Sequence, residues 1–404
     1  MPRFDAEHRL LDRFLMSDVR AATSEDRPQL LSLLREMIPG VDAEARWRWL
    51  YDTNPAGPAL TWVSLAGAQV AGCTSFFPFR MWLDGTVVRG ALGGDGFVRP
   101  AFRRTGRGFQ MHYASWNGMW THRIGCMYGA PGAMNVTPLK RSGSTEIGEV
   151  ARWVRPVRAA GLGVRVPVLC DVALGDPHGA ADLEPMRPDD PRVDRVWSEA
   201  REDLRLAAVR DATFYTWRFL EAPARRQLAF VIVDHGAPIG ACAVEATHRG
   251  KVLRIVDLVT VPGAWHAGLR AIVRYAIERT RVESVDIKLF GRDGRSRQMW
   301  RSGFIKRERK PFLCMIPQGG DRRFLDPARG YYNGADSDLD ALEDPVTRPV
   351  LRSQQIDPHV IAGHRDRVAP QLEPRSSLTA PGVDIERVPV PRADDRVARE
   401  LAVP

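Results

Sequence analysis

The spacing of apolar residues predicts alternating helices and strands in the first half of the chain. Leucines recur at helical spacing after Ser24, a good helix-capping residue, and Asp42 begins a second helix. The helices, which carry apolar residues on one face, are expected at about 24–38, 42–51, 106–120 and 134–141. The strands, which are short apolar runs bounded by turn residues such as Asp84-Gly85, are expected at about 19–22, 60–66, 70–82, 86–98, 124–128 and 150–154.

The second half repeats this order of elements. Its helices, again periodic in apolar residues, are expected at about 211–220, 265–280 and 295–301. Its strands are expected at about 228–234, 238–247, 252–261, 284–289 and 309–316. The chain therefore contains two units with the same succession of helices and strands.

An internal repeat supports a duplication. Residues 49–56 read WLYDTNPA and residues 217–224 read WRFLEAPA, so both fit W-x-[YF]-x-x-x-P-A at a separation of 168 residues. A strand, a glycine-containing turn and a second strand follow each copy, and Gly72 and Gly240 are again 168 residues apart. We expect two tandem domains.

The predicted boundaries follow from composition and periodicity. The first domain is expected over 1–157 and the second over 185–340, and a linker rich in Gly, Pro and Asp joins them over 158–184. Residues 341–404 are rich in Pro, Arg and Asp and show little periodicity, which is typical of a poorly ordered tail.

Charge and composition narrow the classes of partner. The 404 residues include 58 Lys and Arg against 49 Asp and Glu, which gives a net charge of +9. This excess suits a polyanionic partner such as a nucleotide cofactor, an acidic carrier protein or tRNA. A GC-rich genome, which encodes arginine freely, would produce the same excess. No long basic run typical of a nucleic-acid-binding arm is present, so nucleic acid is not expected as a partner except as a tRNA donor.

Several classes of protein are excluded by the sequence. Five cysteines lie far apart and form no C-x-x-C pair, and the histidines form no H-x-x-x-H or H-E-x-x-H motif. We therefore expect no disulfide framework and no metal site. The charged N-terminus is unlike a signal peptide. The sequence also has no run of about 18 apolar residues, the length that a membrane-spanning helix needs. A cytoplasmic location is the expectation.

The motif with the clearest chemistry is V-R-P-A-F-R-R-T-G-R-G at residues 98–108. A strand ends near Pro100 and a helix begins near Gly106, so exposed N–H groups at the helix start face outward. The helix dipole and neighbouring arginines favour negative charge there. This geometry suits a pyrophosphate, and the motif matches neither the P-loop nor the Rossmann fingerprint.

This segment resembles the acyl-CoA loop of the GNAT family, the GCN5-related N-acetyltransferases. Their loop follows [QR]-x-x-G-x-[GA] after a strand ending V-x-P, and Arg103, Gly106 and Gly108 match it here. The resemblance implies an α/β (α+β) fold of two tandem GNAT-like domains, each a mixed, mostly antiparallel sheet flanked by helices. It implies acetyl-CoA as co-substrate, held by Val98, Arg103, Arg104, Thr105, Gly106, Arg107, Gly108 and Asn135.

The second half departs from this pattern. Its equivalent stretch, residues 259–269, keeps the strand and the proline but lacks the arginine cluster and the matching glycines. Only Gly303-Phe304 resembles the closing signature of the family. We therefore expect a degenerate second domain that supports the first and shapes the acceptor pocket.

The resemblance also implies catalytic roles. Asp95, on the fourth strand, is the candidate general base, and an aspartate bonded to backbone N–H groups of a turn or bulge is the alternative. Tyr128, at the end of the fifth strand, is the candidate acid, and an ordinary strand-end aromatic is the alternative. Asn135 matches the family asparagine that contacts the cofactor, or else it caps a helix. The tyrosine that the family often has after this asparagine is missing from 138–143.

These residues predict a GNAT-type N-acyltransferase. It would move an acetyl or other acyl group from acyl-CoA to an amine of a small molecule by direct attack in a ternary complex. A FemX-like or carrier-protein-dependent acyl or aminoacyl transferase is one alternative, and a non-catalytic binding protein with the same fold is another. The acceptor amine and the oligomeric state stay open.

Overall fold

The computed structural model describes residues 18–174, 179, 181–223, 227–290 and 295–337. Strands are β1 (Val19–Ala21), β2 (Leu60–Ala66), β3 (Gln69–Leu83), β4 (Thr86–Val98), β5 (Cys126–Gly129), β6 (Thr145–Pro156), β7 (Asp182–Pro185), β8 (Leu206–Ala208), β9 (Gln227–Asp234), β10 (Ala237–Thr247), β11 (Val252–Thr260), β12 (Ser284–Phe290), β13 (Ile305–Met315) and β14 (Gly330–Tyr331). The predicted tail, 341–404, lies outside the described residues.

The helices are mostly short. The α-helices are α2 (Arg27–Met37), α3 (Ala43–Arg46), α4 (Arg107–Met119), α5 (Ala133–Arg141), α6 (Pro167–Cys170), α7 (Pro191–Ala200), α8 (Ala212–Tyr215), α9 (Trp265–Arg279) and α10 (Arg295–Arg301). The 3-10 turns are η1 (Ser24–Asp26), η3 (Pro100–Phe102), η4 (Trp120–His122), η5 (Ala159–Leu162), η7 (Arg322–Leu325) and η8 (Gly334–Asp336), and the π-helical turns are η2 (Trp47–Asp52) and η6 (Thr216–Leu220).

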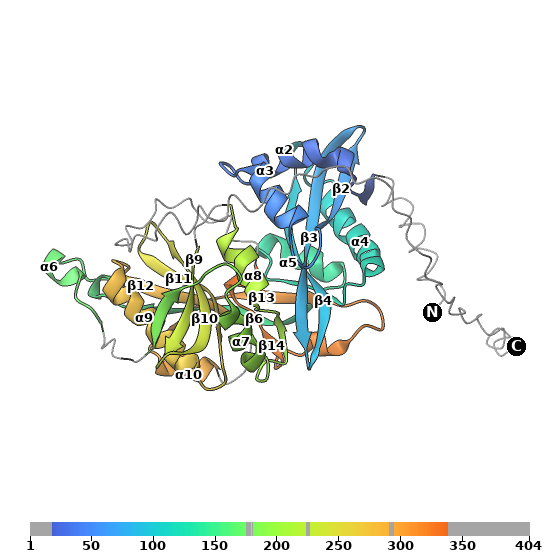
Figure 1. Ribbon diagram of the computed structural model, residues 1–404. Coiled ribbons are helices and arrows are strands. Elements are labelled where there is room, and N and C mark those ends of the chain that lie inside the picture. Colours follow the sequence, from blue (N-terminus) through green and yellow to red (C-terminus); the bar gives the residue numbers. More distant parts are fainter. Residues whose placement is uncertain (1–17, 175–178, 180, 224–226, 291–294, 338–404) are drawn as a thin grey trace, which may run out of the picture. The chain divides into compact units, whose positions relative to one another are not determined.

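The strands join in one mixed sheet flanked by helices, which confirms the predicted fold class (Figure 1). The order is β1-β2-β3-β4-β5-β13-β6-β12-β11-β10-β9-β7. Most neighbours are antiparallel, whereas β4–β5 and β11–β12 are parallel. The predicted division into two domains stays a prediction, because strands from both halves of the chain share this sheet.

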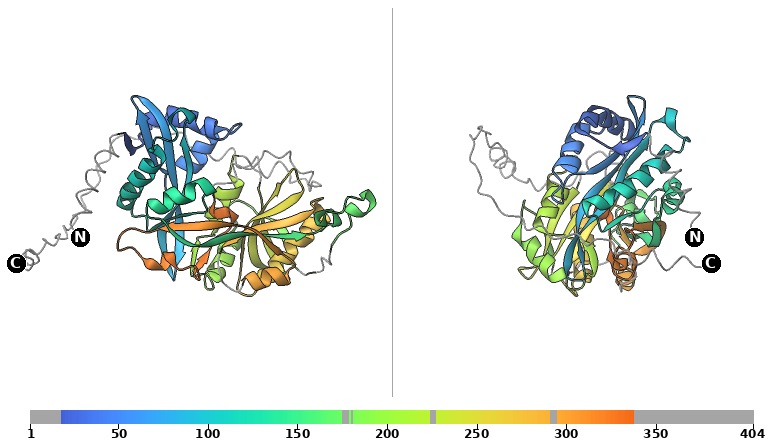
Figure 2. Two further views of the ribbon diagram at one scale, coloured as in Figure 1. Left: turned by 180° about the vertical axis from the view of Figure 1, so that it is seen from behind. Right: turned by 90° about the vertical axis from the view of Figure 1, so that its right-hand side faces the viewer.

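The two halves of the chain exchange strands at the middle of the sheet. β13, late in the sequence, pairs with β5 and β6 of the first half, and β6 pairs in turn with β12 (Figure 2). Burying a strand between partners from the other half satisfies its backbone N–H and C=O groups on both edges. The first-half strands are thus continuous with those of the second half.

The two copies of the sequence repeat meet directly. Trp49 Nε1 donates to Trp217 O at 2.7 Å, and Trp217 Nε1 donates to Trp49 O at 3.0 Å. Their rings stack with centroids 5.5 Å apart, and both side chains are buried. Each tryptophan lies in a π-helical turn, η2 or η6. The repeated W-x-[YF] motif therefore forms a reciprocal contact between the two halves.

Replacing Trp217 by phenylalanine is expected to lower the free energy of unfolding by about 1–3 kcal/mol, because Trp49 O would lose the buried indole N–H that donates to it. Urea unfolding measures the change. Trp300→Phe is the control, since Trp300 is 56% exposed and its replacement should change stability by less than about 0.5 kcal/mol. Equal changes in the two variants would contradict a stabilising role for the reciprocal contact.

The repeated glycines serve the same purpose in both halves. A Cβ at Gly72 would lie 2.7 Å from Phe97 O, and one at Gly240 would lie 2.9 Å from Val259 O. At these positions only glycine allows β4 to lie this close to β3, and β11 to lie this close to β10. The structural equivalence of the two hairpins thus extends to backbone contacts.

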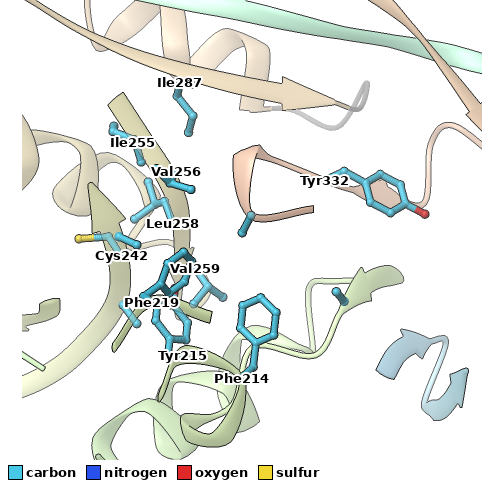
Figure 3. Packing of buried hydrophobic residues seen from close by; sticks show 14 of the residues in the cluster. Phe214, Tyr215, Phe219, Cys242, Ile255, Val256, Leu258, Val259, Ile287 and Tyr332 are labelled. Carbon is cyan, nitrogen blue, oxygen red and sulfur yellow. The ribbon is translucent and has the colours of Figure 1, made fainter. Parts of the chain in front are cut away.

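The second half contains elements that periodicity did not predict. They include β7, α7 and β8, and β7 begins inside the predicted linker 158–184. α7 buries Val193, Val196 and Trp197 on one face, and the Asp190 side chain accepts from Arg192 N at its start. Figure 3 shows part of the apolar core of this half, to which Val256 and Leu258 of β11, Phe214 and Tyr332 all contribute side chains.

Candidate functional site

β4 and β5 diverge where the candidate site lies. Their parallel pairing covers Gly90–Leu92 against Cys126–Tyr128 and goes no further. Beyond it, β4 shifts register against β3, and Asp95 takes a left-handed φ of 47°. This bulge turns the end of β4 away from β5 and opens space between them.

A pocket of about 380 Å³ fills the opening. Its walls come from the end of β4, from β5 and the turn after it, from α4 and α5, and from two later segments of the chain. The lining residues include Asp95, Gly96, His112, Tyr128, Gly129, Gly132, Asn135, Leu313 of β13 and Asp336 of η8. The first half therefore supplies most of the pocket, and β13 and η8 close it.

Several of the lining glycines are not required by packing. A Cβ at Gly96 or Gly129 would meet its nearest neighbour only at 3.8 or 3.9 Å, and one at Gly132 would meet nothing within 4 Å. A larger residue could therefore be built at these positions without a clash within the chain. Their lack of side chains keeps the pocket open for an extended ligand.

The predicted loop leads from this pocket to the start of α4. Arg104 and Gly106 have left-handed φ values of 65° and 83°, and Gly106 is the N-cap residue of α4. The first helical hydrogen bond runs from Gln110 N to Gly106 O at 3.0 Å, so the N–H groups of the residues before Gln110 face out of the helix start. These N–H groups and the helix dipole favour an anion.

The side chains of this loop divide into two groups. Arg104 is exposed, whereas Arg103 Nε donates to Val98 O at 2.9 Å and Thr105 Oγ1 donates to Phe102 O at 2.7 Å. Arg107 turns back to β2, where Nη1 donates to Ser64 Oγ and Leu65 O, each at 2.7 Å. Arg107 therefore fixes α4 to β2 through its side chain, and Arg104 presents its guanidinium to solvent.

Asp95 lines the pocket and is 4% exposed, and it forms a buried ion pair. Arg46 Nη2 donates to Oδ1 at 2.7 Å and Arg46 Nε to Oδ2 at 3.2 Å, while the Tyr51 hydroxyl donates to Oδ2 at 2.8 Å. The Asp95 carboxylate supplies a counter-charge to the buried Arg46 guanidinium. The predicted role of Asp95 as base stays a prediction, and its contacts favour a structural ion pair.

Tyr128 lies in the pocket wall with a buried hydroxyl that has no hydrogen-bond partner among the described residues. Its ring packs against Phe312, Tyr332 and Phe79. Burial raises the pKa of Tyr128 well above its ordinary value, and the nearby Asp336 carboxylate raises it further. The phenol therefore keeps its proton at neutral pH, as a general acid must.

Asn135 lies within α5 and lines the pocket. The N-cap of α5 is Gly132, which accepts through its backbone O from Asn135 N at 2.9 Å. The side chain of Asn135 is exposed and does not cap the helix. Its predicted contact with the cofactor arm stays a prediction.

Two residues of the pocket were not predicted from the sequence. His112 projects from α4, and burial lowers its pKa, so its imidazole is neutral near pH 7. Asp336 comes from η8 at the far end of the described chain and is 3% exposed. A histidine one turn after Gly108 was a signal available in the sequence, whereas no local pattern marks Asp336.

The opening between β11 and β12, which corresponds to the pocket of the first half, is filled by the chain itself. β11 and β12 pair only up to Ile255 and Ile287. Beyond this pairing, Asn333 bridges to Leu289 and donates through Nδ2 to Asp257. A Cβ at Gly334 would lie 2.8 Å from Val256 O. Residues 333–336 therefore occupy the space between the two strands.

The described residues contain neither a membrane-spanning helix nor a cluster of metal ligands. No helix in the described part of the chain is long and apolar enough to cross a membrane. Within the same residues, no group of three or more His, Cys, Asp and Glu side chains is placed to hold a metal ion.

Comparison with known proteins supports the predicted fold. No family model matches the sequence, and no curated protein matches it significantly. A GCN5-related N-acetyltransferase from Anabaena variabilis ATCC 29413 matches with a TM-score of 0.56 and 16% identity over 74% of this chain and 73% of that one. A protein of unknown function from Enterococcus faecalis V583, described as a probable N-acyltransferase, gives 0.55 and 14% over 74% and 72%.

A third structure agrees with these two. A GCN5-related N-acetyltransferase from Kribbella flavida matches with a TM-score of 0.50 and 16% identity, over 74% of this chain and 71% of that one. The chain therefore has the GNAT fold, as its loop motif predicted. Identities this low show the fold and leave the activity to be argued from the site.

Proposed function

We propose that this protein is an N-acyltransferase that moves an acetyl or other acyl group from acyl-CoA to an amine of a small molecule. The observation that carries the proposal is the pocket between the diverging ends of β4 and β5, beside an anion-binding helix start. Gly96 of the pocket lies two residues before Val98, where the loop begins, and His112 lies one turn after Gly108. A ligand with a pyrophosphate and an extended arm fits this arrangement.

The backbone of the loop would bind the pyrophosphate, because the outward N–H groups at the start of α4 offer donors and a positive dipole end. Arg104 adds an exposed positive charge. The arm would run over the lining glycines into the pocket, where its thioester would reach Tyr128. Acyl-CoA supplies the activated acyl group, and the Tyr128 hydroxyl would donate a proton to the departing sulfur.

Other donors remain alternatives on the same fold. A carrier protein or an aminoacyl-tRNA would also match the net charge of +9. A non-catalytic binding protein would keep the loop without the chemistry. The position of the Tyr128 hydroxyl favours a catalyst, because this residue lines the pocket and its phenol has no hydrogen-bond partner among the described residues. A cytoplasmic location is part of this proposal.

Acetyl-CoA binding, measured by calorimetry, tests the proposal. The wild type should bind with a dissociation constant in the micromolar range, and Gly108→Ala should weaken binding at least about tenfold, since a methyl group would stand where the backbone meets the phosphates. A Cβ at Gly108 meets nothing within 4 Å of the protein. The same variant should therefore be more stable by about 0.5–1 kcal/mol, as expected for alanine replacing glycine in a helix.

Asn117→Ala is the matched control, because Asn117 is exposed at the other end of α4. It should leave acetyl-CoA binding unchanged. Absence of acetyl-CoA binding to the wild type would refute the acyl-CoA proposal and favour a carrier-protein or tRNA donor. Equal binding by Gly108→Ala would place the cofactor elsewhere.

A further inference from the structure

The pocket contains three buried polar atoms that have no hydrogen-bond partner among the described residues. They are His112 Nδ1, Tyr128 Oη and Asp336 Oδ1, and all three residues line the same pocket. Buried polar groups in proteins are nearly always paired, and a ligand in the pocket that these three residues line would supply the missing partners. At neutral pH the Tyr128 phenol keeps its proton and the His112 imidazole is neutral, so of the three groups only the Asp336 carboxyl group can supply a negative charge.

Asp336 is held firmly by its other oxygen. Arg210 Nη2 donates to Oδ2 at 2.6 Å, and Asn333 N donates to the same atom at 2.9 Å. Arg210 is itself fully buried and binds Asp257 on β11. The carboxylate is therefore fixed in orientation, and Oδ1 accepts no hydrogen bond from the part of the chain that the structure describes.

The position of Asp336 follows from the filled opening between β11 and β12. Residues 333–336 occupy that opening, and the segment that closes it carries Asp336 to the pocket of the first half. Asp336 also lies close enough to Tyr128 to raise its pKa. The second half of the chain thus contributes a carboxylate to the site in the first half.

Asp336 differs from Asp95, the other carboxylate that lines the pocket. Both oxygens of Asp95 accept from Arg46, and Tyr51 donates to one of them. By contrast, Oδ1 of Asp336 has no donor among residues 18–337 as far as they are described, and burial raises the pKa of this carboxyl group despite the neighbouring Arg210. A raised pKa makes a carboxylate a better proton acceptor at neutral pH.

We propose that Asp336 Oδ1 binds the ammonium group of the acceptor and accepts its proton, so that the base of the reaction comes from the second half of the chain. This inference rests on the proposed function. It also defines the substrate class as an amine that is protonated in solution, because a fixed buried carboxylate favours a cation over a neutral group.

The proton balance of the transfer is complete with these two residues. Asp336 takes one proton from the ammonium group, and the freed nitrogen lone pair attacks the thioester carbon. The C–N bond forms, the C–S bond breaks, and Tyr128 gives its proton to the departing sulfur. The new amide nitrogen keeps one proton and returns the other to Tyr128, and Asp336 releases its proton to solvent.

Two thioether analogues of acyl-CoA test the inference without a known acceptor. S-(2-aminoethyl)-CoA places an ammonium group one carbon beyond the position of the thioester carbon, and S-propyl-CoA is its neutral counterpart of similar size. The wild type should bind the aminoethyl compound about 10- to 100-fold more tightly, since hydrogen bonds to charged groups are the stronger ones. Asp336→Asn should remove this preference while it binds S-propyl-CoA as the wild type does.

Asp257→Asn is the matched control, because Asp257 binds the same Arg210 and lies outside the pocket. It should keep the preference for the ammonium compound. A wild type that binds both analogues equally, or an Asp336→Asn variant that keeps the preference, would overturn the inference. If the variant does not fold, the wild-type comparison decides. Failure of both CoA analogues to bind would instead refute the proposed function.

Discussion

Replacing Arg210 by methionine is expected to lower the free energy of unfolding by about 3–5 kcal/mol, which could prevent folding altogether. Arg210 is fully buried, and its Nε and Nη2 donate to Asp257 at 2.9 Å and Asp336 at 2.6 Å. Its guanidinium also lies 4.6 Å from the centre of the Phe214 ring. Without it, two buried carboxylates would lose the guanidinium that pairs with both of them. Urea unfolding measures the loss.

Arg195→Met provides the comparison, since the Arg195–Glu199 pair is exposed. Its loss should change stability by less than about 0.5 kcal/mol. A change of similar size for Arg210→Met would mean that the carboxylates do not depend on this guanidinium. The double variant Arg210→Met/Asp257→Asn should recover part of the stability, because it leaves one buried carboxylate unpaired instead of two.

Local sequence patterns predicted much of the first half correctly. The strand at 60–66 has the predicted bounds, and β4 ends at Val98 as expected, because the alternating residues and the Asp84-Gly85 turn are local signals. The same patterns could not show that β13 would pair with β5 and β6. Strand partners depend on contacts between residues far apart in sequence, for which periodicity carries no information.

For the candidate site, too, local motifs could be predicted from the sequence, whereas contacts between distant residues could not. The loop of Gly106 and Gly108 is a continuous motif, and the structure places it at the start of α4. The ion pair of Asp95 depends on Arg46, 49 residues earlier, and the position of Asp336 depends on Arg210, 126 residues earlier. Neither pairing leaves a local signal. The sequence alone therefore could not predict these two ion pairs, which form only when the fold brings distant segments together.

Tyr128→Phe is expected to slow acyl transfer by about 10²- to 10⁴-fold, which is the usual contribution of a positioned general acid. Its stability should stay the same or rise by about 1–3 kcal/mol, because the lost hydroxyl is buried without a partner. Release of free CoA from acetyl-CoA, in the presence of primary amines that support turnover, measures the rate. Calorimetry should show unchanged binding of acetyl-CoA, since the hydroxyl acts on the departing sulfur.

A slower rate of transfer together with unchanged or higher stability would show that the Tyr128 hydroxyl acts in catalysis and not in holding the fold. Tyr332 offers a matched control, because its hydroxyl is also buried and unpaired among the described residues, yet Tyr332 does not line the pocket. Tyr332→Phe should raise or preserve stability and leave the rate of transfer unchanged. A Tyr128→Phe variant that transfers at the wild-type rate would remove Tyr128 from the chemistry. Equal loss of activity in both variants would mean that their shared aromatic packing, and not proton donation, controls the rate.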